Sequence, residues 1–128
     1  MMFRVDNQSR QAVYEQIIEA VEKYVLTGIL MCGDKMPSVR KLSVELNVNP
    51  NTVQRAYSEL ERSGVLAIAP GRGAFVTYEA KAMLKKEKRK EYLKDLENIL
   101  TELKVSGVGK KLIFEIVESV FEGGNNDD

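Results

Sequence analysis

Hydrophobic residues recur every three or four positions through the first half of the chain, which is the spacing of one face of an α-helix. The first such stripe predicts a helix over residues 10–27, with Ser9 as its N-cap and Gly28 as its stop. A shorter stripe predicts a second helix with Ser38 as its N-cap. We expect this helix to end at Asn47, because asparagine tolerates the left-handed conformation that the exit from a helix requires.

A third helix is predicted directly after this turn. Asn49 can cap it, and Pro50 suits the first helical position, where its missing N–H costs nothing. Its core-facing stripe consists of Val53, Ala56, Tyr57 and Leu60. Two strands, Val65–Ala69 and Ala74–Tyr78, follow and are joined by a glycine-rich turn. The chain is therefore predicted to be mostly α with a small β-wing, a winged helix-turn-helix domain over residues 1–78, which presents one helix to the major groove of DNA.

The remaining residues predict a second, purely helical region over residues 79–122. A long helix is expected from about residue 80 to 104, and Gly107–Gly109 separates it from a last helix. Residues 123–128 are expected to form a disordered tail. The domains are thus predicted to be 1–78, 79–122 and 123–128.

The two C-terminal helices carry apolar stripes that are too broad for the helices to bury on each other. The residues of these stripes are Leu96, Ile99, Leu100, Leu103, Ile113, Ile116, Val117 and Val120. We expect them to pair with the same helical hairpin of a second chain and so to form a homodimer. The alternative is that the hairpin packs back onto the N-terminal domain.

The composition is that of a folded, water-soluble domain. Of the 128 residues, 44% are hydrophobic and 30% are charged. No stretch approaches the ~18 apolar residues of a membrane-spanning helix, and the N-terminus has no signal-peptide pattern. We therefore expect a cytoplasmic protein without a membrane partner. The lone Cys32 is either a small buried hydrophobe or a redox sensor, and the sequence offers no cation cluster that would activate it.

Catalytic and metal chemistry find little support in the sequence. The chain has no histidine and a single cysteine, which excludes a structural zinc site of four Cys/His ligands and removes the commonest general base. We expect no cofactor, no metal and no enzymatic activity. The formal net charge is +0, but DNA binding depends on where the charges lie, and we expect acid and base to be segregated by face.

Several blocks of the chain, in their order and spacing, resemble the GntR family of bacterial transcription regulators. The blocks are Y-E-Q-I, G-D-K-M-P-S-V-R-K-L, N-T-V-Q-R-A-Y-S-E-L-E-R-S-G-V-L and G-R-G-A-F-V, within Val13–Val76. The short C-terminal part is similar to that of the YtrA-type subgroup. This resemblance implies a homodimer that acts on DNA and often controls transporter genes. Asn47 stands where relatives usually have glycine, and Ala12 stands where they often have proline. Gln54 stands where some relatives have arginine, so the operator sequence that it reads can differ.

The resemblance places DNA contacts at Arg40, which could fork onto a guanine or instead pair with Glu45. Arg55 is expected either to reach a phosphate or to pair with Glu59. Arg72 could enter the minor groove, or could lie in solvent at the hairpin tip. The complete predicted DNA-binding set is Arg40, Asn49, Asn51, Thr52, Gln54, Arg55, Gly71, Arg72 and Gly73.

The basic run Lys81–Lys94 directly follows the wing. It either adds phosphate contacts or forms a solvated helix face. A two-fold dimer predicts an inverted-repeat operator with half-sites about one helical turn apart, and repression by blocking polymerase.

Two other functions remain open. The winged helix could be a protein-interaction module without DNA binding. Alternatively, an unknown small-molecule effector could bind at the dimer seam, because the ~50 residues after the wing are too few to enclose a pocket within one chain.

Overall fold

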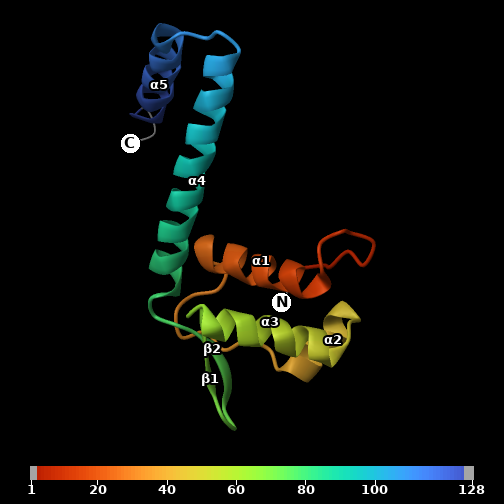
Figure 1. Ribbon diagram of the computed structural model, residues 1–128. Coiled ribbons are helices and arrows are strands. Elements are labelled where there is room, and N and C mark those ends of the chain that lie inside the picture. The colour runs from red at the N-terminus through yellow and green to blue at the C-terminus, as the bar shows by residue number, and fades with distance from the viewer. Residues whose placement is uncertain (1–2, 126–128) are drawn as a thin grey trace. The chain divides into compact units, whose positions relative to one another are not determined.

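The computed structural model describes residues 3–125, which form two compact units over residues 3–87 and 88–125. The first unit contains the helices α1 (Val13–Leu26), α2 (Val39–Leu46) and α3 (Pro50–Arg62) and the strands β1 (Leu66–Ala69) and β2 (Gly73–Val76). Helix α4 (Ala80–Val105) begins in the first unit and continues into the second, which also holds α5 (Lys110–Asn125). Figure 1 shows the mostly helical chain and the two-stranded wing, as the sequence predicts.

Side-chain caps set the boundaries of the helix-turn-helix. The Ser38 hydroxyl accepts a hydrogen bond from the backbone N–H of Lys41 at 3.1 Å, and the Asn49 side chain accepts one from the N–H of Asn51 at 2.8 Å. Between the two helices, Asn47 has φ 55° and ψ 51°, the expected left-handed conformation. These three residues therefore behave as the sequence predicts.

The predicted start of the first helix is wrong. Helix α1 begins at Val13, and Ser9 caps no helix, since its hydroxyl accepts from the backbone N–H of Gln11. The cause lies in Gln16, whose side chain exchanges two hydrogen bonds with the backbone of Asp6, at 2.7 and 2.9 Å, and donates a third to the Gln11 carbonyl. These bonds hold the residues before Val13 in turns. A helix over the same residues would have to break them.

The core of the first unit forms where α1, α3 and the wing meet. Ile17, Val21 and Val25 of α1 are buried there. All four predicted stripe residues of α3 are also buried, so that prediction is confirmed. Ala80 and Leu84 from the start of α4 belong to the same core, which places the first turns of that helix in the first unit.

The wing is an antiparallel pair whose register runs from Leu66 opposite Val76 to Ala69 opposite Gly73. The strands are shorter than predicted, because the chain leaves the ladder before Tyr78, which is 89% exposed. The far edge of β2 is paired too: Lys35 forms a β-bridge with Phe75. The sequence pattern does not predict this third extended segment.

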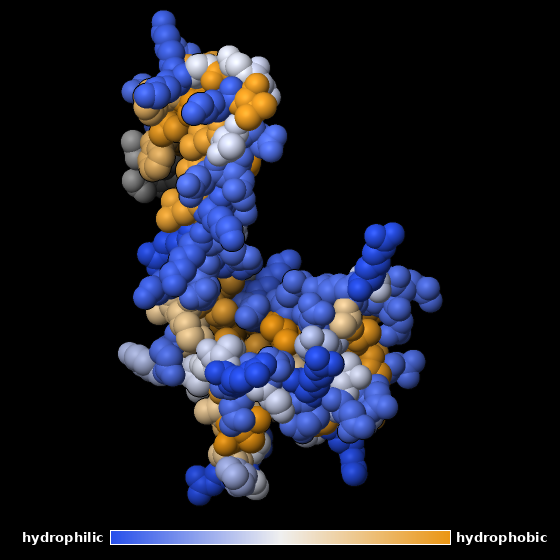
Figure 2. All heavy atoms as spheres, viewed as in Figure 1, coloured by the Kyte–Doolittle hydropathy of each residue, from blue (hydrophilic) through white to orange (hydrophobic). Residues whose placement is uncertain are grey.

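In the second unit, the break at Gly107 (φ 88°) separates α4 from α5, as expected. Helix α5 continues to Asn125, so residues 123–125 are helical rather than part of a disordered tail. The rest of that expected tail, residues 126–128, lies outside the described residues. Figure 2 shows hydrophobic side chains on the surface of this unit, and they come from both helices.

Candidate nucleic-acid interface

The polar residues predicted to contact DNA lie on the outside of the first unit. Arg40 is exposed in the first turn of α2. In α3, Asn51 and Gln54 are exposed and Thr52 is half-buried in the first turn. Gln54 donates a hydrogen bond to the Ser58 hydroxyl at 3.2 Å, one turn further along the same helix. Helix α3 thus presents a row of short amide and hydroxyl groups that can pair with base edges or phosphates.

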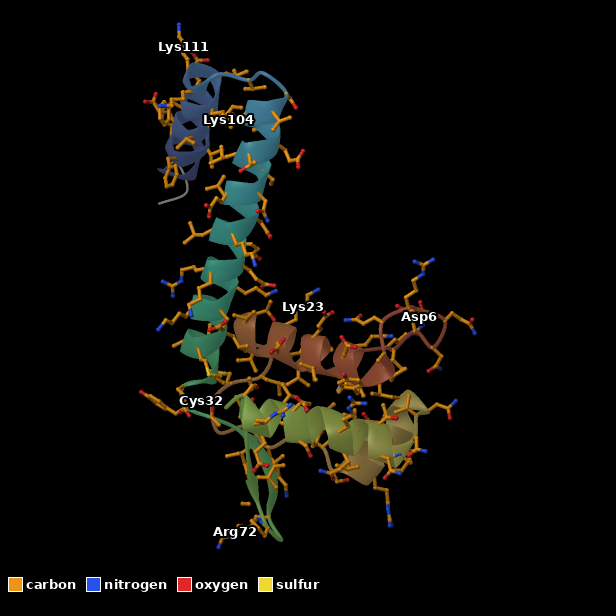
Figure 3. All side chains as sticks on the ribbon, viewed as in Figure 1. Asp6, Lys23, Cys32, Arg72, Lys104 and Lys111 are labelled. Carbon is orange, nitrogen blue, oxygen red and sulfur yellow. The ribbon has the colours of Figure 1, made fainter. Side chains whose placement is uncertain are left out.

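The tip of the wing is a tight turn that carries one arginine between two glycines. The backbone N–H of Arg72 donates to the Ala69 carbonyl at 2.9 Å, and this bond closes the turn. Gly71 has φ 78° and Gly73 has φ 113°, values that a side chain would make costly. The exposed Arg72 side chain extends from this tip (Figure 3).

Helix α3, the predicted recognition helix, and the wing border the same hollow, which has a volume of about 330 Å³. Gln54 from α3 and Arg72 from the wing line it, together with Lys35. A Cβ atom placed on Gly73 would lie 3.0 Å from the Cε of Lys35, so this lysine packs against the base of the wing tip. The hollow therefore gathers two cations and an amide from three separate segments of the chain.

Lys35 is a residue of this surface that the sequence pattern does not predict. It lies in the Gly33–Lys35 turn, where a lysine normally indicates only a solvated loop. Its position follows from the bridge to Phe75, and Met36 reinforces that pairing by donating its N–H to the Ala74 carbonyl at 2.8 Å. The alternation of polar Lys35 with buried Met36 was the only local signal of an extended segment.

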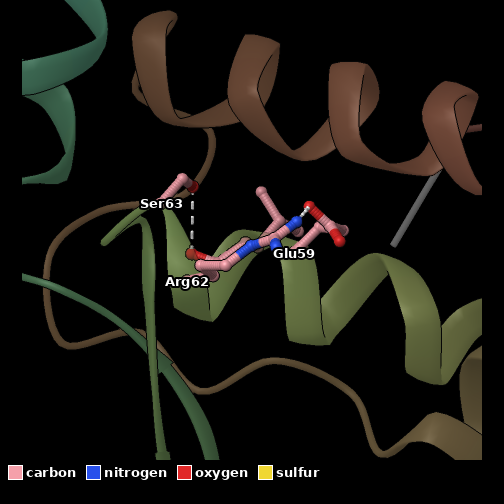
Figure 4. A network of polar contacts seen from close by, with 4 residues as sticks. Glu59, Arg62 and Ser63 are labelled. Atoms are coloured by element: carbon pink, nitrogen blue, oxygen red, sulfur yellow. Dashed lines mark hydrogen bonds and ion pairs between the residues drawn. The ribbon is translucent and has the colours of Figure 1, made fainter.

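Arg55 and Glu59, which the sequence offered as an ion pair, have other partners in the structure. The Arg55 guanidinium lies over the Tyr14 ring, 3.8 Å from its centroid. Glu59 instead forms an ion pair with Arg62, and Ser63 donates its hydroxyl to the Leu60 carbonyl beside them (Figure 4). The Arg62 hydrogen bond lowers the pKa of Glu59, with the charge of Arg55 as a weaker contribution. The Arg55–Glu59 ion pair predicted as one alternative is therefore replaced by an Arg62–Glu59 pair.

A buried tyrosine links α3 to the start of α2. The Tyr57 hydroxyl donates a 2.7 Å hydrogen bond to the Pro37 carbonyl, one residue before the N-cap of α2. Burial raises the pKa of the Tyr57 phenol well above its ordinary value, and the nearby charge of Glu45 raises it further. The phenol is therefore a neutral donor, and it fixes the spacing of the two helices.

A second hollow, of about 680 Å³, shares the Lys35–Ser38 segment with the first and is otherwise lined by residues of α1, the following turn and α2. Ile29, Leu30 and Met36 give it an apolar lining, and Lys41 contributes a cation. This hollow belongs to the first unit, whereas the sequence placed an effector site at a seam between C-terminal helices.

Three further features of the described residues concern metal binding, membrane spans and the lone cysteine. Residues 3–125 contain no cluster of three or more His, Cys, Asp or Glu side chains that could hold a metal ion. None of the helices described is long and apolar enough to cross a membrane. Cys32 is exposed, so of the two alternatives for this residue the buried hydrophobe is wrong: the turn between α1 and α2 carries the thiol at the surface (Figure 3).

Comparison with known proteins decides the family. The model described as bacterial regulatory proteins, gntR family, matches residues 13–76, the segment that runs from α1 to the end of the wing. The chain belongs to the GntR family. The members of this family are transcription regulators, and the GntR match covers all the DNA-binding residues that the sequence predicted.

Relatives extend the similarity beyond the GntR segment. The HTH-type transcriptional repressor YtrA of Bacillus subtilis (strain 168) is 35% identical over 130 residues, which cover 99% of this chain and 100% of the relative. A crystal structure of a transcriptional regulator from Oenococcus oeni matches with a TM-score of 0.80 at 34% identity, over 91% of this chain and 97% of that one. The GntR protein described here is thus similar to YtrA-type regulators in its C-terminal helices as well.

A more distant solved structure is the AraR DNA-binding domain in complex with its operator ORX1. It matches with a TM-score of 0.51 at 22% identity, over 59% of this chain and 100% of that one. At this identity the match shows a shared fold.

Proposed function

We propose that this GntR-family regulator binds DNA sequence-specifically and represses transcription as a homodimer on an inverted-repeat operator. The observation that carries the proposal is the shared hollow, where Gln54 of α3, Arg72 of the wing tip and Lys35 line one surface. Helix and wing must reach the same duplex in a winged-helix contact, and these side chains supply hydrogen-bond donors for bases and phosphates. In its crystal structure the AraR domain, whose fold this unit shares, is bound to an operator.

Each residue has a proposed task that follows from its position. Arg40, at the start of α2, donates two hydrogen bonds to a guanine. Gln54, one turn into α3, pairs with a base edge. Asn51 and Thr52 contact phosphates at the N-terminus of α3, where the helix dipole favours negative charge. Arg72 enters the minor groove or neutralises a flanking phosphate, which the small glycines beside it permit.

The homodimer would be built from the second unit. Several large apolar side chains of α4 and α5 are exposed there, among them Ile99, Ile116 and Val120. A folded chain rarely leaves so many large apolar side chains of one region in water. Pairing with a second copy would cover it and would place two recognition helices on one duplex. The similarity to YtrA suggests transporter genes as targets.

The test begins with selection of operator fragments from random DNA, followed by binding measurements on the selected and on scrambled duplexes. We expect Arg40→Ala to lose about 1–3 kcal/mol on the selected operator while non-specific binding persists, because a guanine contact discriminates by that amount. Lys23→Ala, which removes an exposed cation from the last turn of α1, serves as the control. Equal loss on every sequence would mean that Arg40 touches only phosphate.

A chain that fails to bind any duplex at low salt would leave the alternative of a protein-interaction module. A random duplex in a gel shift separates the two functions, because non-specific binding requires only the phosphate contacts. The DNA-binding proposal predicts a shifted band that weakens steeply as salt rises.

A second candidate function, sensing of a small molecule, is favoured by the 680 Å³ hollow beside α2. Its volume and largely apolar lining are typical of ligand sites. A metabolite that binds the folded state alone raises the melting temperature. Substituting Ile29, an exposed residue of the lining, with Asp should abolish such a shift, while a shift that persists would place the effector elsewhere.

A further inference from the structure

The contact between Tyr14 and Arg55 joins α1, for which the sequence predicts no DNA contact, to α3, which it predicts to contact DNA. Tyr14 lies in the first turn of α1 and is half-buried, and Arg55 lies on the exposed side of α3. The guanidinium carbon of Arg55 is 3.8 Å from the centroid of the Tyr14 ring. Tyr14 belongs to the Y-E-Q-I block, for which the proposed function provides no task.

A stacked arginine keeps its hydrogen-bonding capacity. A guanidinium that stacks on an aromatic ring turns its flat face to the ring, and its N–H donors then point outward in the plane of the group. The stack therefore restricts the rotamers of a long side chain without occupying the donors that a phosphate would accept. An ion pair with a carboxylate would have the opposite effect, because it would occupy those donors.

The neighbouring carboxylate is engaged by another arginine. Glu59 lies one turn beyond Arg55, the spacing at which a helical ion pair forms. Arg62 forms that pair instead and hydrogen-bonds to the Glu59 carboxylate. The two contacts together hold Arg55 on an aromatic surface rather than on an acid.

We propose that Tyr14 is a positioning residue for DNA binding, whose ring holds the Arg55 guanidinium extended toward a backbone phosphate. The inference rests on the proposed DNA-binding function and adds α1 to the elements that support the interface. Of the two roles expected for Arg55, a phosphate contact or an ion pair with Glu59, the proposal adopts the phosphate contact. A preorganised side chain loses less conformational freedom when it binds, so removal of the ring should weaken binding although Tyr14 itself touches no DNA.

The experiment is a double-mutant cycle on operator binding with Tyr14→Leu, Arg55→Gln and the double variant. We expect Tyr14→Leu to weaken operator binding about two- to tenfold, the cost of immobilising one long side chain on binding. Tyr14→Phe retains the ring and should bind as the unmodified chain does. In the Arg55→Gln background, Tyr14→Leu should cause no further loss. Arg55→Gln should also reduce the salt slope by about one per protomer.

Other results of these measurements would contradict the positioning role of Tyr14. An equal loss from Tyr14→Leu with and without Arg55 would show that the ring only supports the fold, and melting curves of all variants would report that role directly. Loss in Tyr14→Phe would assign the effect to the hydroxyl group. If the unmodified chain binds DNA and Arg55→Gln changes neither affinity nor salt slope, this inference fails alone. If the unmodified chain binds no duplex, the proposed function itself fails.

Discussion

At the scale of single residues, two side chains fix the geometry of the helix-turn-helix. Tyr57 ties α3 to the Pro37 carbonyl, and Asn47 turns the chain between α2 and α3. One acts through a buried hydrogen bond and the other through backbone conformation. Their contributions to stability therefore respond to different substitutions and to different conditions.

Replacement of Tyr57 by Phe should lower the free energy of unfolding by about 1–2 kcal/mol at neutral pH, because the Pro37 carbonyl loses its donor. The phenol also makes stability depend on pH. Its folded pKa is raised above the ordinary value of 10.0, so the unfolded chain loses this proton first as pH rises. The contribution is complete below pH ~10 and falls above it. Urea unfolding at pH 7 and above pH 10 should show that Tyr57→Phe reduces this alkaline loss; an unchanged slope would contradict the assignment.

Asn47 allows a matched pair of substitutions. Asn47→Ala should cost about 1 kcal/mol, since φ 55° strains an alanine, whereas Asn47→Gly should be neutral or slightly stabilising. Denaturant unfolding of the two variants measures the difference. Equal stabilities would mean that the turn relaxes out of the left-handed conformation.

At the scale of elements, the wing is more than a hairpin. Its second strand is paired with β1 on one edge and with the Lys35 segment on the other. This pairing connects the wing to the residues that open α2. The wing therefore packs against the Lys35 segment near Gly73, while the turn at Gly71 has open space around it.

Two glycines of the wing should respond differently to alanine. Gly71 has open space around it, so Gly71→Ala should cost only the strain of its positive φ, about 1 kcal/mol. Gly73→Ala should cost more, about 1–3 kcal/mol, because φ 113° is less accessible to an alanine, whereas the flexible end of Lys35, 3.0 Å from the new Cβ, can move aside. Urea unfolding ranks the two variants. The reverse order would show that the backbone at Gly73 adapts to alanine more readily than the backbone at Gly71.

At the scale of the whole molecule, the second unit exposes what a folded chain normally buries. In α5, Phe114 is 63% and Ile116 is 54% exposed, and in α4, Ile99 is 56% exposed. Full burial of an exposed side chain of this size is worth ~1.5–3 kcal/mol, and these residues, about half exposed, have roughly half of that left to gain in an assembly. The assembly of two chains is the proposal that accounts for this surface.

Ile116→Asp should convert the proposed dimer into a monomer, because a carboxylate in an apolar seam has no partner. Sedimentation equilibrium at micromolar concentration measures the mass. Glu118→Gln, a change at an exposed polar position of the same helix, should leave the dimer intact. The monomeric variant should bind a half-site as before and lose the added affinity for the inverted repeat. A monomeric unmodified chain would refute the dimer.

The sequence by itself determined the order of the elements and most of their ends. Ser38, Asn47 and Asn49 have local tasks, capping and turning, that depend on a few neighbouring residues. The buried stripe of α3 was predictable because the helical period fixes which side chains share a face. The predicted contact set followed from the resemblance together with this periodicity.

Only the tertiary structure decided which side chains meet across elements. Lys35 reaches the wing through backbone pairing with Phe75, and Arg55 lies on Tyr14 while Arg62 holds Glu59. No local pattern encodes these choices, because several partners lie within reach of each long side chain and the packing of α1 against α3 selects among them. The start of α1 was mispredicted for the same reason: the side chain of Gln16 binds backbone ten residues earlier.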